Sequence, residues 1–412
     1  LSDVFLEFEQ TLFAQSSLSL ERAIQDIKVN KKLDGEIEKF LIFLSPYFLL
    51  NNAHKALEWL IYRFRIHEFN KDQFLLLILP YHETRMFVRA LQLLDLSDEA
   101  DNWHWLEPLQ KPGIPLASIT LINRLGSNNA LLKLICNHVT TATRIHSERA
   151  SSLNTLYAFY TTSILGILDR SSTISEIQLG HMLPTILKGL ESPISDFVAS
   201  TYMILAKLMF KEKLNSETME KLLLKIFKKT YLKEEALLLL FVLYNVPVHP
   251  LTSVSQSLAT RLSELSWFVE LAIKLQSSNV NILKFIVPLL QISCRMIVDN
   301  PAEYKLQKMV NEILTRIKLD HIGVDTILWN ILQKELLSND MSNEARDFLI
   351  KLYHTFERMY PERFDDYLKG LIKRSETDNN SKLALQFVTS WHFGARDTQE
   401  VVGILDKLIH IS

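Results

Sequence analysis

The sequence is poor in cysteine and in the residues that make tight turns. Its 412 residues include 10 glycines and 12 prolines, well below the roughly 7% and 5% of an average protein. Few turn residues favour long helices over many short strands. The two cysteines, Cys136 and Cys294, are too few for a disulfide framework or a cysteine-rich zinc site. Because both lie in apolar runs, we expect buried free thiols in a reducing compartment.

A strong net charge and long apolar runs are also missing. The formal net charge is −2, from 45 basic and 47 acidic residues. Any contact with nucleic acid must therefore come from a local patch rather than from the chain as a whole. The runs FLLLILP and ALLLLFVLY fall far short of the roughly 18 residues that a membrane span needs, so we expect no membrane partner. The first residue is Leu1 rather than methionine, so the lack of a signal peptide excludes little.

The sequence does contain apolar residues at the period of a helix. Hydrophobic residues make up 48% of the chain, which is normal for a packed protein. Ala53, Ala56, Leu57, Leu60 and Phe64 follow the i, i+3, i+4 spacing of one helical stripe. No stretch alternates convincingly as a strand does, and the many leucines favour helix. We therefore predict an all-α fold.

The stretch LPYHETRMFVR (residues 79–89) is predicted to join two helices. Pro80 ends the first helix because a proline removes a backbone donor. Thr84 is suited to cap the second helix by accepting a backbone N–H bond. His82 and Glu83 fall in the joint, where we expect His82 to bond a carbonyl and Glu83 to pair with nearby arginines.

Motifs for catalysis or for metal binding are not found. The HET triplet is not H-E-x-x-H, because Met86 stands where the second histidine would be. His54, His67 and His82 are dispersed in the sequence. There is no nucleophile elbow, no glycine-rich phosphate loop and no paired-carboxylate pattern. We predict a protein that is not an enzyme and has no cofactor, no metal site and no small-molecule substrate.

The middle of the chain repeats a pattern of a shorter helix, a joint and a longer apolar helix. The three units are LLKLICNHV followed by LNTLYAFYTTSILGIL, LPTILKGL followed by DFVASTYMILAKL, and LLLKIFKK followed by EEALLLLFVLYNV. A period of roughly 40 residues with paired helices is typical of HEAT and armadillo repeats. Such pairs bury their apolar faces by stacking, so we predict an α-solenoid of HEAT/armadillo-like helix pairs.

One segment interrupts this helical texture. The stretch NWHWLEPLQKPGIPLAS holds Pro108, Pro112, Gly113 and Pro115, the densest cluster of helix breakers in the chain. We therefore predict N-terminal helical repeats over residues 1–101, a Trp/Pro-rich loop over 102–117, and HEAT-like repeats over 118–412. Trp103, Trp105 and Pro112 of this loop are candidate anchors for a protein partner. Alternatively, the tryptophans are pinned back onto the helices beneath.

A second candidate surface is a stripe of lysines with Phe227 and Tyr231 interleaved. Its spacing of i, i+4, i+7, i+8 and i+12 lines the charges along one helical face and just beyond, at Lys221, Lys225, Lys228, Lys229 and Lys233. Such a stripe suits RNA phosphates. The alternative is an ordinary solvated face with glutamates at its ends. Arg63 and Arg65 are weaker candidates for RNA contact.

Several stretches together resemble one known family. They are SPYFLLNNAHKALEWLIYRFRIHEFNKDQFLLLILPYHETRMFVRALQLL from Ser45, LFAQSSLSLER from Leu12, WHWLEPLQKPGIPLA from Trp103 and STYMILAKL from Ser200. The resemblance is to the N-terminal region of the large HEAT-repeat subunit of the small-subunit processome, the U-three-snoRNA-associated protein ten family. In animals it is called HEAT-repeat-containing protein one. The match is specific over the first hundred or so residues and diffuse beyond about residue 210.

The resemblance implies a nuclear, nucleolar scaffold without catalytic residues. It places the chain in the transcription-associated U-three-protein subcomplex, which supports pre-rRNA transcription and processing towards 18S rRNA. Implied partners are β-propeller subunits, with the pre-rRNA 5′ external spacer and U-three snoRNA as candidate RNAs. Family members are much longer than this chain. The alternative is a transport or adaptor α-solenoid that carries protein cargo and has no RNA role.

Overall fold

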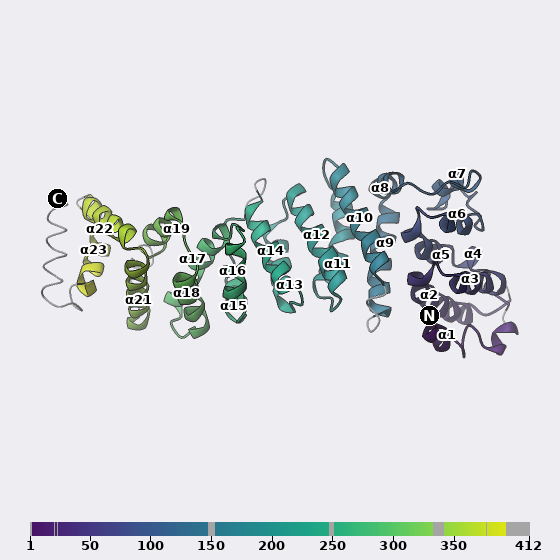
Figure 1. Cartoon of the computed structure of the whole chain (residues 1–412), viewed down its shortest axis with the longest axis horizontal. Coiled ribbons are helices and arrows are strands. Elements are labelled where there is room, and N and C mark those ends of the chain that lie inside the picture. Colours follow the sequence, from purple (N-terminus) through teal and green to yellow (C-terminus); the bar gives the residue numbers. More distant parts are fainter. Residues whose placement is uncertain are drawn as a thin grey trace. The chain divides into compact units, whose positions relative to one another are not determined.

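The structure is a computed structural model of the chain. It describes residues 2–19, 21–22, 24–146, 153–246, 251–332, 342–375 and 377–392. These residues form helices and turns, and none of them lies in a strand, which confirms the all-α prediction. Packing divides the chain into two compact units, Leu1–Lys213 and Leu214–Ser412. Figure 1 labels the helices along the chain. In the sequence, the chain is divided by composition and helix pattern rather than by packing. This division into residues 1–101, 102–117 and 118–412 remains a prediction.

The first part of unit 1 consists of helices of unequal length. They are α1 (Ser2–Glu7), η1 (Gln15–Ser19), α2 (Ile27–Leu44), η2 (Ser45–Tyr47), α3 (Asn51–Phe64), α4 (Ile66–Phe69), α5 (Lys71–Ile78), η3 (Leu79–Tyr81) and α6 (Arg85–Leu91). The predicted apolar stripe of α3 is confirmed, since Ala53, Ala56, Leu57, Leu60 and Phe64 are all buried. Helix α3 ends at Arg65, whose left-handed φ of 50° turns the chain into α4.

The joint between α5 and α6 forms as its sequence predicts. Pro80 lies in the single 3₁₀ turn η3, directly after α5. The Thr84 hydroxyl then accepts a hydrogen bond of 3.2 Å from the Phe87 N–H and so caps α6. Glu83 makes a different contact from the expected arginine pair, because its carboxylate accepts a hydrogen bond of 2.5 Å from the Ser118 hydroxyl.

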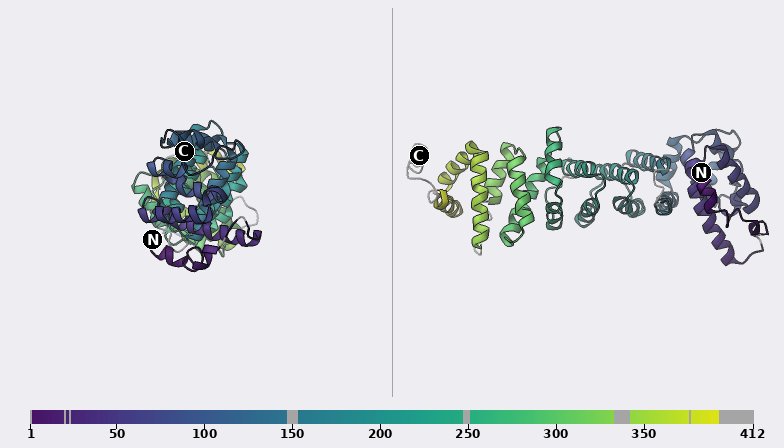
Figure 2. Two further views of the ribbon diagram at one scale, coloured as in Figure 1. Left: turned by 90° about the vertical axis from the view of Figure 1, so that its right-hand side faces the viewer. Right: turned by 60° about the horizontal axis from the view of Figure 1, so that its bottom comes forward.

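The rest of unit 1 is more regular. Its helices are η4 (His104–Leu106), α7 (Glu107–Gln110), α8 (Ser118–Ser127), α9 (Asn129–Ile145), α10 (Asn154–Arg170), α11 (Glu176–Leu190) and α12 (Ser195–Lys211). Helix α11 packs on α9, and α12 packs on α10, so that the first and second helices of the two pairs form two layers (Figure 2). Gly189 allows α11 and α12 to approach closely, because a Cβ there would collide with the Thr201 side chain.

Unit 2 repeats this arrangement. Helix α13 (Ser216–Lys228) packs on α15 (Gln256–Ser263), and α14 (Lys233–Asn245) packs on α16 (Phe268–Ser277). The remaining elements are α17 (Leu283–Asp299), α18 (Tyr304–Arg316), α19 (His321–Thr326), the π-helical η6 (Ile327–Leu332), α21 (Asn343–Met359), α22 (Pro361–Ser375) and α23 (Asn379–His392). The three predicted repeats coincide with α9–α10, α11–α12 and α13–α14, which confirms HEAT-like helix pairs. The expected shorter first helix is found only in α11–α12, with 15 and 17 residues, because the helices of α9–α10 have 17 residues each and those of α13–α14 have 13 each.

The core of both units is built from aliphatic and aromatic side chains. Cys136 and Cys294 are buried in it as free thiols, as the sequence predicts. Burial raises the pKa of Cys136 to about 12, because a thiolate is poorly solvated in an apolar interior. Within the described parts of the chain, none of the helices combines the length and the apolar character that a membrane crossing requires.

Candidate interaction surfaces

The Trp/Pro segment (residues 102–117) folds back onto the helices that precede it. Trp103 is 0% exposed, and its indole N–H donates to the Asp72 carboxylate at the start of α5, at 2.7 Å. The Trp103 backbone N–H donates to Asp101 at 3.0 Å. Both N–H groups of this buried residue therefore have partners within the chain.

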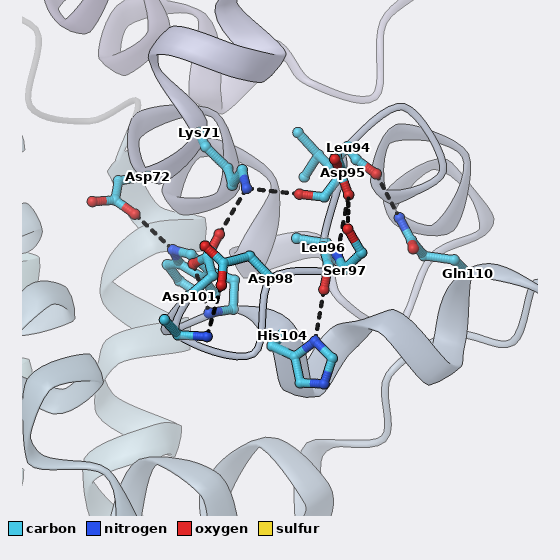
Figure 3. A network of polar contacts seen from close by, with 12 residues as sticks. Lys71, Asp72, Leu94, Asp95, Leu96, Ser97, Asp98, Asp101, His104 and Gln110 are labelled. Carbon is cyan, nitrogen blue, oxygen red and sulfur yellow. Dashed lines mark hydrogen bonds and ion pairs between the residues drawn. The ribbon is translucent and has the colours of Figure 1, made fainter.

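A network of polar contacts fixes residues 95–101, which directly precede the Trp/Pro segment. The Lys71 ammonium donates to the Asp95 carbonyl and to the Asp101 carboxylate, each at 2.7 Å (Figure 3). The Asp95 carboxylate accepts hydrogen bonds from Ser97, and these lower the pKa of Asp95. The His104 ring lies 2.7 Å from the Leu96 carbonyl. One lysine of α5 thus holds both ends of residues 95–101.

Two glutamines attach the middle of the segment to α6. The Gln110 side-chain amide donates to the carbonyls of Leu91 and Leu94, at 2.7 and 2.9 Å. In return, the Gln92 side-chain amide donates to the Gln110 carbonyl at 2.8 Å. The Leu91 carbonyl at the end of α6 also accepts a hydrogen bond of 3.2 Å from the Leu94 N–H, so Gln110 adds a second bond to this carbonyl while it holds the segment in place.

A pair of hydrogen bonds between His82 and Leu116 closes the segment. The His82 ring lies 2.7 Å from the Leu116 carbonyl, and the Leu116 N–H donates to the His82 carbonyl at 3.0 Å. His82 is only 8% exposed, so these bonds form away from solvent. The expectation that His82 bonds a carbonyl is confirmed, although the carbonyl belongs to the Trp/Pro segment rather than to the joint itself.

The three residues that the sequence proposes as partner anchors lie in different environments. Trp103 belongs to the interior, which matches the alternative of a tryptophan pinned to the helices beneath. Trp105 is half-buried, with the Arg124 guanidinium 5.9 Å from its ring centroid. Pro112 is exposed. The structure therefore leaves Trp105 and Pro112 at the surface, and their role in binding a partner stays a prediction.

The lysine stripe (Lys221, Lys225, Lys228, Lys229 and Lys233) lies mainly on α13. The buried residues of this helix, which include Leu222, Leu223 and Ile226, face inward. The lysines within α13 fall on the opposite side of the helical wheel, because they recur at the same i, i+4, i+7 period. Lys225 is half-buried and the other four lysines are exposed. The Lys221 ammonium pairs with Glu217 at 2.6 Å.

The aromatic residues around the stripe differ in exposure. Tyr231 is 53% exposed, whereas Phe227 is 0% exposed and belongs to the core. Phe227 is a neighbour of the lysines along the chain, but the helical period turns its ring inward. Lys233 opens α14, and its ammonium lies 5.7 Å from the Trp267 ring centroid, within the range of a cation–π contact.

One basic residue beside the stripe was missed in the sequence. Arg261 of α15 donates from Nε to the Phe227 carbonyl at 2.9 Å and from Nη2 to the Lys228 carbonyl at 3.0 Å. These carbonyls also belong to the end of a helix, so this guanidinium caps the C-terminus of α13. Only the packing of α15 on α13 brings Arg261 to this position.

Arg63 and Arg65 are both engaged within unit 1. The Arg63 guanidinium donates from Nε to the Ser17 carbonyl at 3.1 Å. Arg65 donates from Nε to the Glu68 carboxylate at 3.1 Å, and its left-handed backbone ends α3. Their contact with RNA stays a prediction. Among the described residues, no group of three or more histidine, cysteine, aspartate or glutamate side chains is placed to hold a metal ion.

The paired helices and their stacked layers define the class of protein: an all-α, HEAT-like solenoid. Residues 178–292 match the family model described as U3 small nucleolar RNA-associated protein 10. The chain is 31% identical, over 99% of its length, to the HEAT repeat-containing protein 1 homolog of Drosophila melanogaster. It is 33% identical, over 93% of its length, to HEAT repeat-containing protein 1 of Homo sapiens.

A fungal relative carries the other name of the family. The U3 small nucleolar RNA-associated protein 10 of Aspergillus terreus is 31% identical over 53% of the chain and is covered over 13% of its own length. The chain spans 21% of the Drosophila relative and 19% of the human relative. It belongs to the family of HEAT repeat-containing protein 1 and U3 small nucleolar RNA-associated protein 10, which confirms the resemblance seen in the sequence.

Proposed function

We propose that the chain is part of a non-catalytic scaffold of the small-subunit processome. In this proposal it acts within the transcription-associated U-three-protein subcomplex, in the nucleolus, and supports pre-rRNA transcription and processing towards 18S rRNA. Its partners are other subunits of that subcomplex, including β-propeller proteins, with the pre-rRNA 5′ external spacer and U3 snoRNA as RNA partners. The observation that carries the proposal is the family match over residues 178–292, together with relatives along nearly the whole chain.

The fold supports a scaffold because stacked helix pairs offer long surfaces for binding other molecules. The test is to purify the tagged protein from nuclei under mild salt and to identify the RNA and the proteins that accompany it. We expect U3 snoRNA, pre-rRNA and β-propeller proteins to be enriched over an untagged control. Recovery of soluble cargo proteins without these RNAs would contradict the proposal and favour a transport or adaptor solenoid.

We further propose that the lysine stripe contacts RNA phosphates. Its exposed residues Lys221 and Lys228 lie on the outer face of α13, opposite the buried Leu222 and Ile226. Each phosphate that a lysine neutralises on a single strand should contribute a slope of about −0.7 to the logarithm of affinity against that of salt. Changing Lys228 and Lys229 to glutamate should weaken RNA binding and flatten this slope. Unchanged affinity and slope would make the stripe an ordinary solvated face.

We propose that a protein partner meets unit 1 at Trp105 and Pro112. Both residues reach the surface, whereas Trp103 is enclosed by the chain. The test is crosslinking of the intact assembly, with a photoreactive residue placed at either position. Crosslinks to a neighbouring subunit would support this surface. Crosslinks only to the chain itself would contradict it.

A further inference from the structure

A cleft between α18 and α21 of unit 2 has a lining unlike that of the surfaces described above. It is open to solvent, has a volume of about 910 Å³, and is lined from α18 by Tyr304, Gln307, Lys308 and Asn311. These four residues recur at i, i+3, i+4 and i+7, so they lie on one face of the helix. The facing wall comes from α21 and includes Lys351 and Arg358. Two neighbouring helices thus turn polar and charged faces towards one space.

The charge of the cleft is predominantly positive. Its lining holds three cations, Lys308, Lys351 and Arg358, against one carboxylate, Glu357. The Glu357 carboxylate lies 3.7 Å from the His354 ring, with which it forms an ion pair only when the ring is protonated. Lys308 has Glu312 nearby at 3.8 Å, but the lysine side chain is 78% exposed and the pair is correspondingly weak. A ligand with negative charge is therefore favoured.

The cleft also offers an aromatic ring. Tyr304 is 76% exposed, so its ring is accessible to a ligand. Gln307 and Asn311 place side-chain amides beside it on the same wall. Cations that follow a backbone, together with an aromatic ring on which a base stacks, are the combination that binds single-stranded nucleic acid.

A helical protein segment fits this cleft less well. Such a segment binds by inserting apolar anchors into a hydrophobic groove. The apolar residues of the lining are Phe348 and Leu352, and they are only 8% and 3% exposed. The apolar surface of the cleft therefore comes mainly from the Tyr304 ring and the aliphatic parts of the polar side chains, rather than from these two residues of the floor.

We propose that the cleft between α18 and α21 binds single-stranded RNA. Lys351 and Arg358 contact the phosphates, and a base stacks on Tyr304. This assignment rests on the proposed function only in choosing RNA rather than single-stranded DNA. It differs from the lysine stripe, because the ligand enters a cleft between two helices rather than following the outer face of one helix.

The test measures the binding of a short fluorescein-labelled oligouridine to the purified 412-residue chain by fluorescence anisotropy over a series of salt concentrations. The double variant Lys351→Glu, Arg358→Glu should bind about tenfold more weakly or worse. Its salt slope should be shallower by about 1.4, because two phosphate contacts of about 0.7 each are lost. The matched control is Lys305→Glu, Lys369→Glu, which changes two exposed lysines outside the lining and should bind as the parent does.

The stacking role is tested separately from the charge. Tyr304→Ala should weaken binding about fivefold or more without changing the salt slope, whereas Tyr304→Phe should retain the affinity. Circular dichroism establishes that each variant keeps its helix content. Equal losses in the cleft variants and the control, no loss in the cleft variants, or no RNA binding by the parent chain would each overturn the proposal. Binding of an acidic peptide in place of RNA would also overturn it.

Failure of this proposal is distinguishable from failure of the proposed function. If the cleft variants bind oligouridine normally and the protein still recovers U3 snoRNA from nuclei, the cleft assignment is wrong and the scaffold role stands. If the cleft variants lose binding but the protein recovers only soluble cargo, the cleft assignment stands and the scaffold role is wrong.

Discussion

The Trp/Pro segment and helix α13 both contain candidate binding residues, tryptophans in the segment and lysines on the helix. The segment turns Trp103 towards the core, whereas α13 turns its lysines towards the solvent. In the segment, Trp103 is 0% exposed and donates to Asp72. On α13, Lys221 and Lys228 are exposed on the side opposite the core. A regular helix fixes the direction of each side chain by its period. In an irregular segment, the direction of a side chain is determined by its contacts with residues that are distant in the sequence.

The chemistry of the two residue types explains the rest of the difference. A tryptophan combines a large apolar surface with one N–H group, so it is well accommodated inside when that group finds an acceptor. A lysine is almost never fully buried unless it is paired. A lysine opposite an apolar face is therefore an unambiguous sign of an exposed charge, whereas a tryptophan in a loop is compatible with either direction.

The largest effect is expected from removing the buried indole. Trp103→Ala should destabilise the region around α5 and α6 by about 3–5 kcal/mol, because it leaves a cavity and removes the donor to Asp72. Hydrogen exchange of the α5 and α6 backbone amides measures this loss directly. It avoids assigning a single unfolding transition to a chain with two compact units.

The matched control is Trp105→Ala, two residues away on a half-buried side chain. We expect a smaller change in hydrogen exchange from this variant. If Trp103→Ala leaves exchange unchanged but abolishes the binding of a partner subunit, Trp103 is an anchor, and the contrast drawn between the segment and α13 is wrong.

A smaller loss of stability is expected at the joint between α5 and α6, where His82 is bonded to the Trp/Pro segment. His82→Ala removes the ring contact with the Leu116 carbonyl and leaves that carbonyl without this partner. We expect a loss of about 1–3 kcal/mol, seen as faster exchange of the Leu116 amide, which donates to the His82 carbonyl. Metal content, measured by elemental analysis, should not change. A metal lost from the variant would instead make His82 a ligand.

Much of the fold could be predicted from the sequence because helices are local. The apolar period of α3 and the cap at Thr84 depend on residues within a few positions of one another. The repeat of α9–α10, α11–α12 and α13–α14 is visible because each unit carries the same local pattern of two amphipathic helices. These patterns are recognised within one helix or one helix pair, although the pairs bury their apolar faces only by stacking on one another.

The candidate surfaces were less predictable because they depend on distant contacts. Asp72 and Trp103 are 31 positions apart, and nothing in either local sequence marks them as partners. Arg261 reaches the end of α13 from 33 positions away. The cleft beside Tyr304 needs two helices to be placed next to each other. Spacing identifies the lysine stripe and, by the same helical period, places Phe227 on the core side, but it does not fix the direction of Tyr231, which lies beyond the end of α13.

The cations around α13 allow a further test of the difference between side chains that stabilise the fold and side chains that are only exposed at the surface. Arg261→Met keeps much of the side-chain length but removes the donors to the Phe227 and Lys228 carbonyls. We expect a loss of about 1–2 kcal/mol, measured as faster hydrogen exchange in the last turn of α13. Exchange at an unaltered rate would show that water satisfies these carbonyls equally well. Arg261 would then be a surface cation that does not stabilise the end of α13.

The smallest effect is expected from the exposed lysines themselves. Changing Lys221 and Lys229 to glutamine should leave hydrogen exchange of α13 unchanged within error, because exposed side chains away from the core contribute little to stability. Lys221 also pairs with an exposed glutamate, and such pairs are weak. The same variant should bind RNA more weakly if the stripe is a binding surface. A variant that loses stability in proportion to its loss of RNA affinity would instead show that these lysines support the helix, in the way that Trp103 supports its segment.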